Sequence, residues 1–414
     1  MVVVLGGVAV FFTYWLWGPQ ALFGIAARTF DLGTNFVLLA IPLFVFMSSM
    51  LMRSGIADAL YGAMYQWMGG LRGGLAMGTV VVCTVFAAMV GISAAATVPV
   101  GLVALPSMFK RGYDKSITLG CVSAGGALGI LIPPSTVMIM LALFAQLSVG
   151  KLFLGGVFSG LLLASLFIIY IGVRTQLQPE LCPPVPPEER ATLREKFFLL
   201  RSLLMPILLI AAVLGSIFSG AATPTEAAGV GSLGSIVCTA FSRRLTWRNL
   251  LEACFSSLRL SCMIMWIIYA AASFTALYTA VGAQKLIGKA LLALPGGHWG
   301  TLIAMQVILL ILGCFLEPGG IIKITTPLFI PLVRQLGFDP LWFGVLFVMN
   351  MEMAYLTPPV GFNLFYMKAI APKNITMLDI YHSIGPFVAL QATGLVICML
   401  FPQIILWLPN LVIG

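Results

Sequence analysis

The chain has 414 residues, of which 60% are hydrophobic and 8% are charged, and its formal net charge is +9. Soluble domains typically hold about 45–50% apolar and about 25% charged residues, so the composition excludes a soluble globular enzyme and a disordered chain. The basic residues form short clusters between apolar runs, which is typical of loops at the cytoplasmic face of a membrane and not of a nucleic-acid binder. We therefore expect an all-α polytopic membrane protein whose main solvent is the lipid bilayer.

Cysteine and histidine give no sign of a metal centre or of a disulfide framework. Eight cysteines occur without any CxxC pair, and most of them lie inside apolar runs. The two histidines, His298 and His382, are far apart in the sequence. We expect no cofactor other than coupling ions.

The first half begins with an apolar segment at about 2–17, which we interpret as a membrane helix because it has no charged n-region and no cleavage motif. The run 32–52 fits one crossing of about 20 residues. The charge-free run 73–109 is too long for one helix, and we expect a crossing at about 73–90 followed by a re-entrant hairpin at about 92–109. The run 116–150 is interrupted by Pro133-Pro134, which predicts a broken helix at about 117–147.

The most polar stretch, 174–201, is predicted to join a first half, 1–173, to a second half, 202–414. In the second half, we predict a crossing at 299–316 and a re-entrant hairpin after it at about 317–335. Pro358-Pro359 then predicts a second broken helix at about 341–371. Such breaks survive in lipid only where protein or a water-filled cavity surrounds the freed backbone groups.

The two halves resemble each other when the chain is shifted by 225 positions. Matching positions lie in the loop after each hairpin and at each helix break: Pro106 and Pro331, Tyr113 and Phe338, Gly112 and Gly337, Asp114 and Asp339, Leu131 and Leu356, and the two Pro-Pro pairs. Duplicated halves of this kind are typical of secondary transporters, whose sites lie where the breaks meet. Six crossings counted between the hairpins would make the repeats parallel, whereas an interfacial segment among them would make the repeats inverted.

The basic loops 110–115, 174–201 and 243–259 are separated from one another by pairs of crossings. They are therefore predicted to share one side of the membrane, and their Arg and Lys content indicates the cytoplasmic side.

Polar side chains in these apolar segments are candidates for transport chemistry. Ser93 and Thr97 in the first hairpin offer hydroxyl oxygens beside freed carbonyls, a set that suits a hard monovalent cation. In the second hairpin, Lys323 is predicted either to pair with Glu317 or to bind an anionic substrate, and Glu352 is predicted to pair locally, take a proton or help hold a cation.

Other polar residues are predicted to stand at the starts of helices. Asp114 and Asp339 stand at matched positions where a helix cap is the better explanation. The segment Gly220 to Ala228, with Glu226 in the first turn, is predicted to open another helix.

Four motifs in order resemble a known family: Ile41-Pro-Leu-Phe-Val-Phe46, Leu128-Gly-Ile-Leu-Ile-Pro-Pro-Ser135, Thr223-Pro-Thr-Glu-Ala-Ala228 and Leu356-Thr-Pro-Pro-Val-Gly-Phe-Asn-Leu-Phe365. Together they closely resemble the DctM-type large permease subunit of the tripartite ATP-independent periplasmic (TRAP) transporters, over nearly the whole chain. The resemblance implies an elevator-type carrier with inverted repeats in the bacterial inner membrane, working by sodium symport. It further implies two partners, a small four-helix membrane subunit (Q-type) and a periplasmic substrate-binding protein (P-type). It also implies that one counted crossing is not a full one, and that an opening helix common in the family is missing before Met1.

Carrying the family's regions over by motif gives two sets of predicted site residues. The predicted sodium-binding residues are Ser93, Thr97, Gly126, Gly129, Thr326, Thr357 and Gly361. The predicted substrate-binding residues are Ser135, Lys323, Thr325, Glu352 and Asn363. Two departures from the family stand out: Glu317 replaces a common Asp, and Lys323 adds a cation that implies a strongly anionic headgroup.

The resemblance of the C-terminal half points to a subgroup that handles small organic acids, with 2-oxo acids and C2 sulfonates ahead of sialic acid. Three alternatives remain open: a sodium-coupled carboxylate carrier without a binding protein, an intramembrane hydrolase, and a channel. A hydrolase needs a Ser–His pair or two facing Asp residues at membrane depth, and neither histidine is near Ser93 in the sequence. A channel does not need matched hairpins.

Overall fold

The computed structural model describes residues 2–413, and within that range every regular element is a helix. Among the described residues, five helical segments are long and apolar enough to cross a membrane, and a sixth results if the pair Pro19–Gly33 and Phe36–Leu51, bent by 58°, is one span. The five are Ser93–Lys110, Val149–Leu177, Leu193–Phe218, Trp247–Ala280 and Met377–Leu400. The predicted all-α polytopic fold is confirmed.

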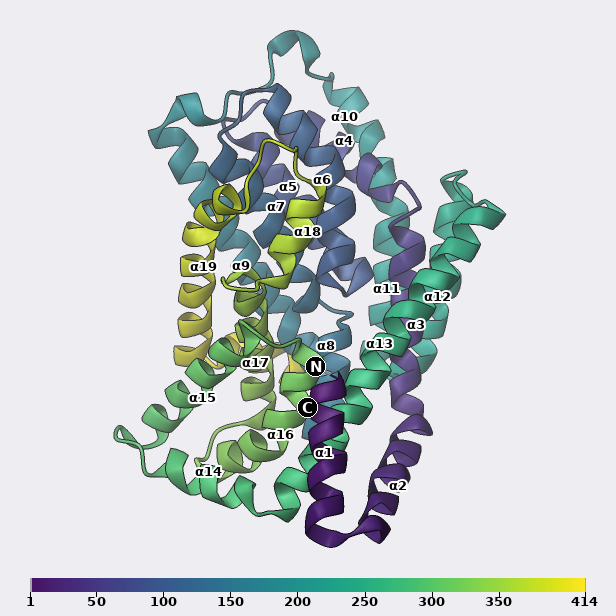
Figure 1. Cartoon of the computed structure of the whole chain (residues 1–414). Helices are drawn as coiled ribbons and strands as arrows, with labels where there is room; N and C mark the ends of the chain where they lie inside the picture. Colours follow the sequence, from purple (N-terminus) through teal and green to yellow (C-terminus); the bar gives the residue numbers. More distant parts are fainter. Residues whose placement is uncertain (1, 414) are drawn as a thin grey trace.

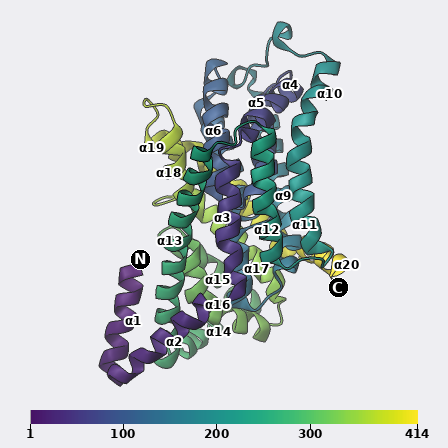
Figure 2. The same ribbon diagram turned by 90° about the vertical axis from the view of Figure 1, so that its right-hand side faces the viewer.

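One group of helices combines the start of the chain with its middle (Figures 1 and 2). Its members are α1 (Val2–Trp17), α2 (Leu22–Gly33), α3 (Ala40–Leu51), α11 (Leu204–Phe218), α12 (Pro224–Phe241) and α13 (Trp247–Ala280). Helix α1 lies along α13, and α3 packs against both α12 and α13. Thr223 caps α12 in a capping box with Glu226, which confirms the predicted helix start.

The first hairpin consists of α5 (Gly74–Val90) and α6 (Ser93–Lys110), with α4 (Ile56–Met68) packed against both. Gly91 has φ of +69°, a left-handed conformation that lets the chain reverse between the two helices. The segments 73–90 and 92–109 are thus two arms of one hairpin, and the prediction of a complete hairpin within 92–109 is wrong. Apolar composition is the same for an arm that turns back and for a helix that crosses, which is why the sequence did not separate them.

The first broken helix follows as α7 (Lys115–Ala127), a 3-10 turn at Leu128–Ile130, and α8 (Thr136–Ala145). The chain then runs through α9 (Val149–Leu177), a loop with short 3-10 turns at Pro179–Leu181 and Pro187–Glu189, and α10 (Leu193–Leu199). Further 3-10 turns lie at Pro19–Ala21, Phe36–Leu39 and Leu200–Leu203. The break in the first helix falls at the predicted Pro133-Pro134.

The second half repeats these elements, and its first helices lie at the lower end of the view in Figure 1. They are α14 (Ala283–Leu292), α15 (Gly297–Gly313), α16 (Pro318–Gln335), α17 (Pro340–Leu356), α18 (Phe362–Ile370), α19 (Met377–Leu400) and α20 (Gln403–Val412). Helices α15 and α16 pack on each other as α5 and α6 do, so 317–335 is again one arm and not a whole hairpin. Because α15 is the other arm of the second hairpin, it no longer counts among the six crossings predicted between the hairpins. The remaining odd number favours inversion, which stays a prediction.

Aligned positions of the two halves share local structure. Gly112 and Gly337 both have positive φ, +73° and +79°, and both Pro-Pro bonds are cis. Asp114 accepts hydrogen bonds from the first backbone N–H groups of α7, and Asp339 does the same for α17. Both predicted helix caps are confirmed.

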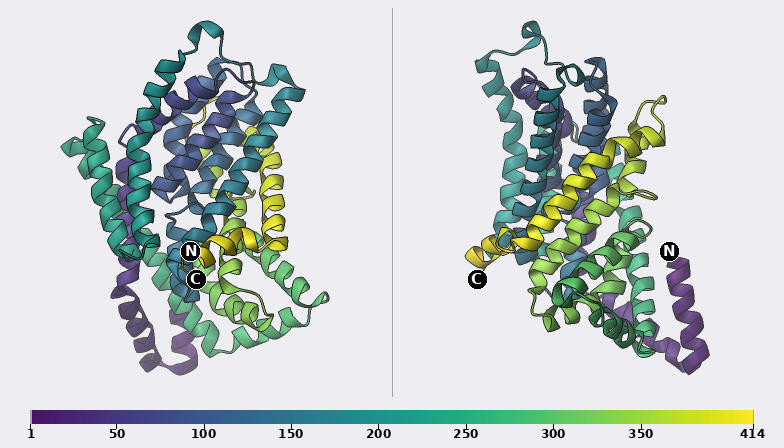
Figure 3. Two further views of the ribbon diagram at one scale, coloured as in Figure 1. Left: turned by 180° about the vertical axis from the view of Figure 1, so that it is seen from behind. Right: turned by 90° about the vertical axis from the view of Figure 1, so that its left-hand side faces the viewer.

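The basic loops 110–115 and 174–201 lie at the same end of the molecule, the upper end in Figure 1. The Asp114 N–H donates to the Leu181 carbonyl over 2.8 Å, and Arg111 forms an ion pair with Glu189. The chain termini lie on opposite sides of the molecule, as the right-hand view of Figure 3 makes clear.

Candidate functional site

The first candidate site joins the first hairpin to both broken helices through Asn363. The Ser93 hydroxyl donates to Asn363 Oδ1 over 2.9 Å, and the Thr97 hydroxyl donates to the same oxygen over 2.7 Å. The Asn363 amide nitrogen donates in turn to the Ser123 carbonyl over 2.6 Å. All four side chains are 0–1% exposed. Residues of α6, α7 and α18 therefore meet in one buried polar cluster.

Glycines at the break let the hairpin tip approach this closely. A Cβ built on Gly126 would overlap with the Thr97 hydroxyl, and one built on Gly91 would overlap with the Pro134 carbonyl oxygen. A Cβ on Gly129 would lie 3.1 Å from the Ile92 carbonyl oxygen. The hairpin tip thus rests directly on the backbone of the first break, and the sequence places small residues where the two surfaces touch.

The donor set of this cluster fits a hard monovalent cation. Ser93, Thr97 and Asn363 bring three neutral side-chain oxygens together. The hydroxyl of Ser123, whose carbonyl accepts from Asn363, is buried without a hydrogen-bond partner among the described residues. Hydroxyl, amide and carbonyl oxygens are the ligands such cations take in membrane proteins. Ser123 was not among the predicted site residues, although a hydroxyl within the glycine-rich motif before the break was a usable signal.

Other predicted residues around the breaks have local roles. The Ser135 hydroxyl caps α8, accepting from the Met138 N–H over 3.2 Å and donating to the Ile130 carbonyl over 2.5 Å. The Thr357 hydroxyl donates to the Met353 carbonyl of its own helix. Gly361 adopts φ of +51° and starts α18, which brings Asn363 into position.

In the second hairpin, the polar residues Glu317 and Thr325 form hydrogen bonds within their own helix. Glu317 caps α16, accepting from the Gly319 N–H over 3.0 Å. The Thr325 hydroxyl donates to the Ile321 carbonyl, while the buried Thr326 hydroxyl has no hydrogen-bond partner. Thr326 therefore has unused capacity for a ligand among the described residues.

Lys323 lines a cavity between α2 and α13 on one side and α8 and α16 on the other. Its ammonium lies 4.1 Å from the centre of the Phe144 ring, and its side chain is 4% exposed. Among the described residues it forms no ion pair, so the alternative in which it pairs with Glu317 is wrong, because Glu317 caps its own helix. The cavity measures about 460 Å³ and has eight lining residues: Arg28, Asp31, Leu32, Phe144, Ala272, Thr275, Lys323 and Pro327.

Glu352 faces α19. Its Oε1 accepts from the Gln391 side-chain amide over 3.0 Å, and its other oxygen has no hydrogen-bond partner. Gln391 was not among the predicted site residues, although a polar side chain inside the apolar helix α19 was a signal for it.

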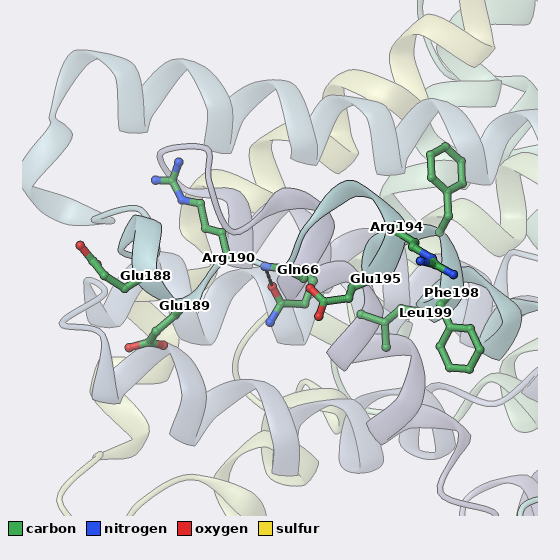
Figure 4. Close-up of a pocket in the computed structure, with 10 residues that line it drawn as sticks. Gln66, Glu188, Glu189, Arg190, Arg194, Glu195, Phe198 and Leu199 are labelled. Atoms are coloured by element: carbon green, nitrogen blue, oxygen red, sulfur yellow. Dashed lines mark hydrogen bonds between the residues drawn. The ribbon is translucent and has the colours of Figure 1, made fainter.

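A further cavity of about 910 Å³ lies at the polar loop before α11 (Figure 4). Three carboxylates and two guanidinium groups line it, and the Ala191 N–H is bonded to Gln66 at its centre. This cavity belongs to the polar loop and not to the helix breaks.

Comparison with known proteins identifies the family. The model of the tripartite ATP-independent periplasmic transporter, DctM component, matches residues 1–404. The chain belongs to this family. The protein is a TRAP transporter large permease, so the predicted recognition is confirmed, and it is a transporter subunit and not an enzyme. Its placement as a multi-pass protein of the inner membrane is likewise confirmed.

Individual relatives agree with this assignment. The C4-dicarboxylate TRAP transporter large permease protein DctM of Pseudomonas aeruginosa is 36% identical over 407 residues, which is 96% of this chain and 92% of that protein. The isethionate TRAP transporter permease protein DctMQ of Oleidesulfovibrio alaskensis is 30% identical, over 92% of this chain and 59% of that protein. The solved structure of Neisseria gonorrhoeae MtrF, from a class of antimetabolite efflux pumps, has a TM-score of 0.66 at 15% identity, covering 95% and 85% of the two chains. This last likeness concerns the fold alone.

Proposed function

We propose that this large permease carries a small organic anion into the cell by sodium symport. The observation that carries the proposal is the Asn363 cluster, in which three neutral oxygens from the first hairpin and the second broken helix converge beside the first break. A cation held there would neutralise freed carbonyl dipoles and fix both breaks in one arrangement. In this proposal sodium is the coupling ion, and Ser93, Thr97, Asn363 and the backbone around Gly126 and Gly129 hold it.

The anion is proposed to bind at Lys323. The Lys323 ammonium is 4% exposed, has no ion-pair partner among the described residues, and lies beside a cavity of about 460 Å³ that Arg28 and Asp31 also line. In this proposal it attracts an anionic group of a small molecule, and Arg28 adds a second positive charge. Thr325 and Thr326 lie beside it in sequence. Relatives named for C4-dicarboxylates and for isethionate, a C2 sulfonate, support an anionic substrate class. Among such anions we keep 2-oxo acids and C2 sulfonates as candidates and add C4-dicarboxylates.

Two partners complete the proposed transporter: a small Q-type membrane subunit and a periplasmic binding protein. The name DctMQ of the isethionate relative supports the first. We further propose inverted repeats and an elevator-type movement of the hairpins and broken helices against the group α1–α3 and α11–α13. In such a movement the surfaces that slide are those where α13 packs on α16 and where α3 and α11 pack on α5.

Uptake into proteoliposomes tests the proposal. The permease is reconstituted with its small subunit and cognate binding protein and supplied with labelled C4-dicarboxylate, 2-oxo acid or C2 sulfonate. We expect accumulation of one anion class only under an inward sodium gradient, and none when potassium replaces sodium. Leak without a gradient would indicate a channel, and full uptake without the binding protein would indicate an autonomous carboxylate carrier.

A further inference from the structure

A carboxylate and an amide face each other in the core of the second half, outside the cluster described above. Glu352 on α17 is 0% exposed and Gln391 on α19 is 2% exposed. The Gln391 Nε2 donates to Glu352 Oε1 over 3.0 Å. Glu352 Oε2 and Gln391 Oε1 are both buried, and neither has a hydrogen-bond partner within the part of the chain that the structure describes. The pair therefore leaves two acceptor oxygens, one on each side chain, without a donor among the described residues.

A neighbouring amide pair shows why this matters. Asn350 Nδ2 donates to the Gln306 side chain over 2.9 Å, and the atoms left without a partner are Asn350 Oδ1, an acceptor, and Gln306 Nε2, a donor. One of these atoms is a donor and the other an acceptor, so they match in type without an added hydrogen. Two leftover acceptors cannot bond to each other, whichever way the Gln391 amide is turned, because neither carries a hydrogen. A buried acceptor without a donor costs about 1–3 kcal/mol. One additional hydrogen between Glu352 and Gln391 would satisfy both.

The surroundings offer Glu352 no counter-charge. Its neighbouring elements and the cap of α16 carry these titratable or charged side chains: Lys115 and Cys121 on α7, Lys151, Tyr170 and Arg174 on α9, His298 on α15, Glu317, Lys323 and Arg334 at α16, Tyr355 on α17 itself, Tyr366 and Lys368 on α18, and Asp379, Tyr381, His382 and Cys398 on α19. None of these described residues forms an ion pair or hydrogen bond with Glu352. An isolated carboxylate in a medium of low dielectric is so costly that such groups become neutral instead.

We propose that Glu352 and Gln391 form a proton-binding site in the transport core, additional to the proposed sodium site. The carboxylate takes one proton from water, the new O–H donates to Gln391 Oε1, and the Gln391 N–H keeps its bond to the carbonyl oxygen of the acid. The result is a neutral acid–amide pair with two parallel hydrogen bonds. Sodium fits less well here than at the Asn363 cluster, because this pair offers two unpartnered oxygens and the cluster offers three side-chain oxygens beside the backbone of the break.

The location gives the proton a role. Glu352 lies in the last turns of α17, before the break at Pro358-Pro359, and the pair fastens α17 to α19. Loss of the proton would leave an uncompensated negative charge near that break. The bound proton thus holds the broken helix in place while remaining chemically distinct from the coupling cation.

Infrared difference spectroscopy of the purified permease tests the site without relying on transport. The spectrum of Glu352→Gln is subtracted from that of the unaltered protein at pH 7 to 8, in sodium and in potassium chloride. We expect the C=O stretch of a protonated carboxylic acid, shifted in D2O and equal in both salts. The exposed Glu195→Gln is the control, and it should change carboxylate bands alone. A difference confined to carboxylate bands, or an acid band that sodium removes, overturns the proposal.

A second variant keeps the test decisive if Glu352→Gln does not fold. Gln391→Leu removes both hydrogen bonds of the proposed pair, so the acid band should move to higher frequency. A band that does not move rules out the pair. Because neither readout requires a sodium gradient or a substrate, failure here and failure of the proposed symport are distinguishable.

Discussion

Asn363 follows the second helix break and forms hydrogen bonds with residues of the first hairpin and of the first broken helix, so that both breaks contribute to one site. Its carbonyl oxygen accepts from Ser93 and Thr97, and its amide donates to the Ser123 carbonyl. Each of these contacts is buried, so removing a partner leaves polar atoms that neither lipid nor water can satisfy. The proposed cation affinity therefore depends on these side chains, and the local caps Ser135 and Thr357 matter less.

Ser93→Ala tests the hydroxyl contribution. A single hydrogen bond contributes about 0.5–1.5 kcal/mol, so losing this oxygen should raise the sodium concentration for half-maximal uptake by up to roughly 10-fold. Sodium titration of uptake measures the change. The matched control is Ser165→Ala, whose hydroxyl bonds to the Leu161 carbonyl of its own helix on an exposed face. An unchanged sodium dependence in Ser93→Ala would remove this residue from the ion site.

Lys323→Gln tests the proposed anion contact. Hydrogen bonds to charged groups contribute about 1.5–3 kcal/mol, so uptake efficiency should fall by roughly 10- to 100-fold, with the sodium requirement retained. The comparison is Lys289→Gln on α14, an exposed lysine outside the cavity. Normal uptake by Lys323→Gln would leave Lys323 as a packing partner of Phe144 only.

At the scale of elements, the docking of the first hairpin on the first break holds the site together. Gly91 reverses the chain between α5 and α6, and its Cα faces the Pro134 carbonyl so closely that a Cβ would overlap with it. Thr136 also donates to the Gly91 carbonyl, over 3.4 Å. The hairpin tip and the break therefore position each other.

Gly91→Ala should separate these two elements. The substitution adds the cost of a left-handed alanine, about 1 kcal/mol, and also an overlap that forces the tip off the break. Gly112→Ala is the matched control, because its φ of +73° is nearly the same while no atom lies within 4 Å of the added Cβ. Thermal unfolding and uptake are measured for both. We expect Gly91→Ala to lose clearly more stability and uptake than Gly112→Ala, and equal losses would show that only the backbone conformation matters.

The breaks and caps were predictable from sequence because their causes are local. Pro133-Pro134, Pro358-Pro359, Asp114 and Asp339 each act on the backbone beside them. The partnership of Ser93 with Asn363 was not predictable, because these residues are 270 positions apart in the sequence and meet only through the packing of α6 against α18. The same applies to Glu352 and Gln391, and to the stacking of Lys323 on Phe144. Hairpin arms were mistaken for crossings because both are equally apolar.

At the scale of the whole molecule, the polar loop before α11 and the turn between α1 and α2 lie at opposite ends (Figure 1). The Arg and Lys content of the loops at the first end predicts that this end is cytoplasmic. The hairpins enter the molecule from opposite ends in the same view, as the proposed inverted repeats require.

Cysteine labelling checks this orientation. In a background where the exposed Cys254 and Cys262 are replaced by alanine, we introduce Ala191→Cys in the polar loop or Gln20→Cys between α1 and α2. A membrane-impermeant maleimide should label Gln20→Cys in spheroplasts and Ala191→Cys only in inverted vesicles. Labelling of both from the same side would contradict the topology.

The central claim is that sodium binds where the hairpin and the two breaks meet, and sodium-dependent thermal stability of the purified permease tests it most directly. A ligand at 100 times its Kd stabilises the folded state by about 2.7 kcal/mol. The account predicts that the Tm rises with sodium chloride but not with potassium chloride at equal ionic strength, and that Asn363→Ala abolishes this rise. An identical sodium-dependent rise in Asn363→Ala, or the absence of any rise in the unaltered protein, would contradict it.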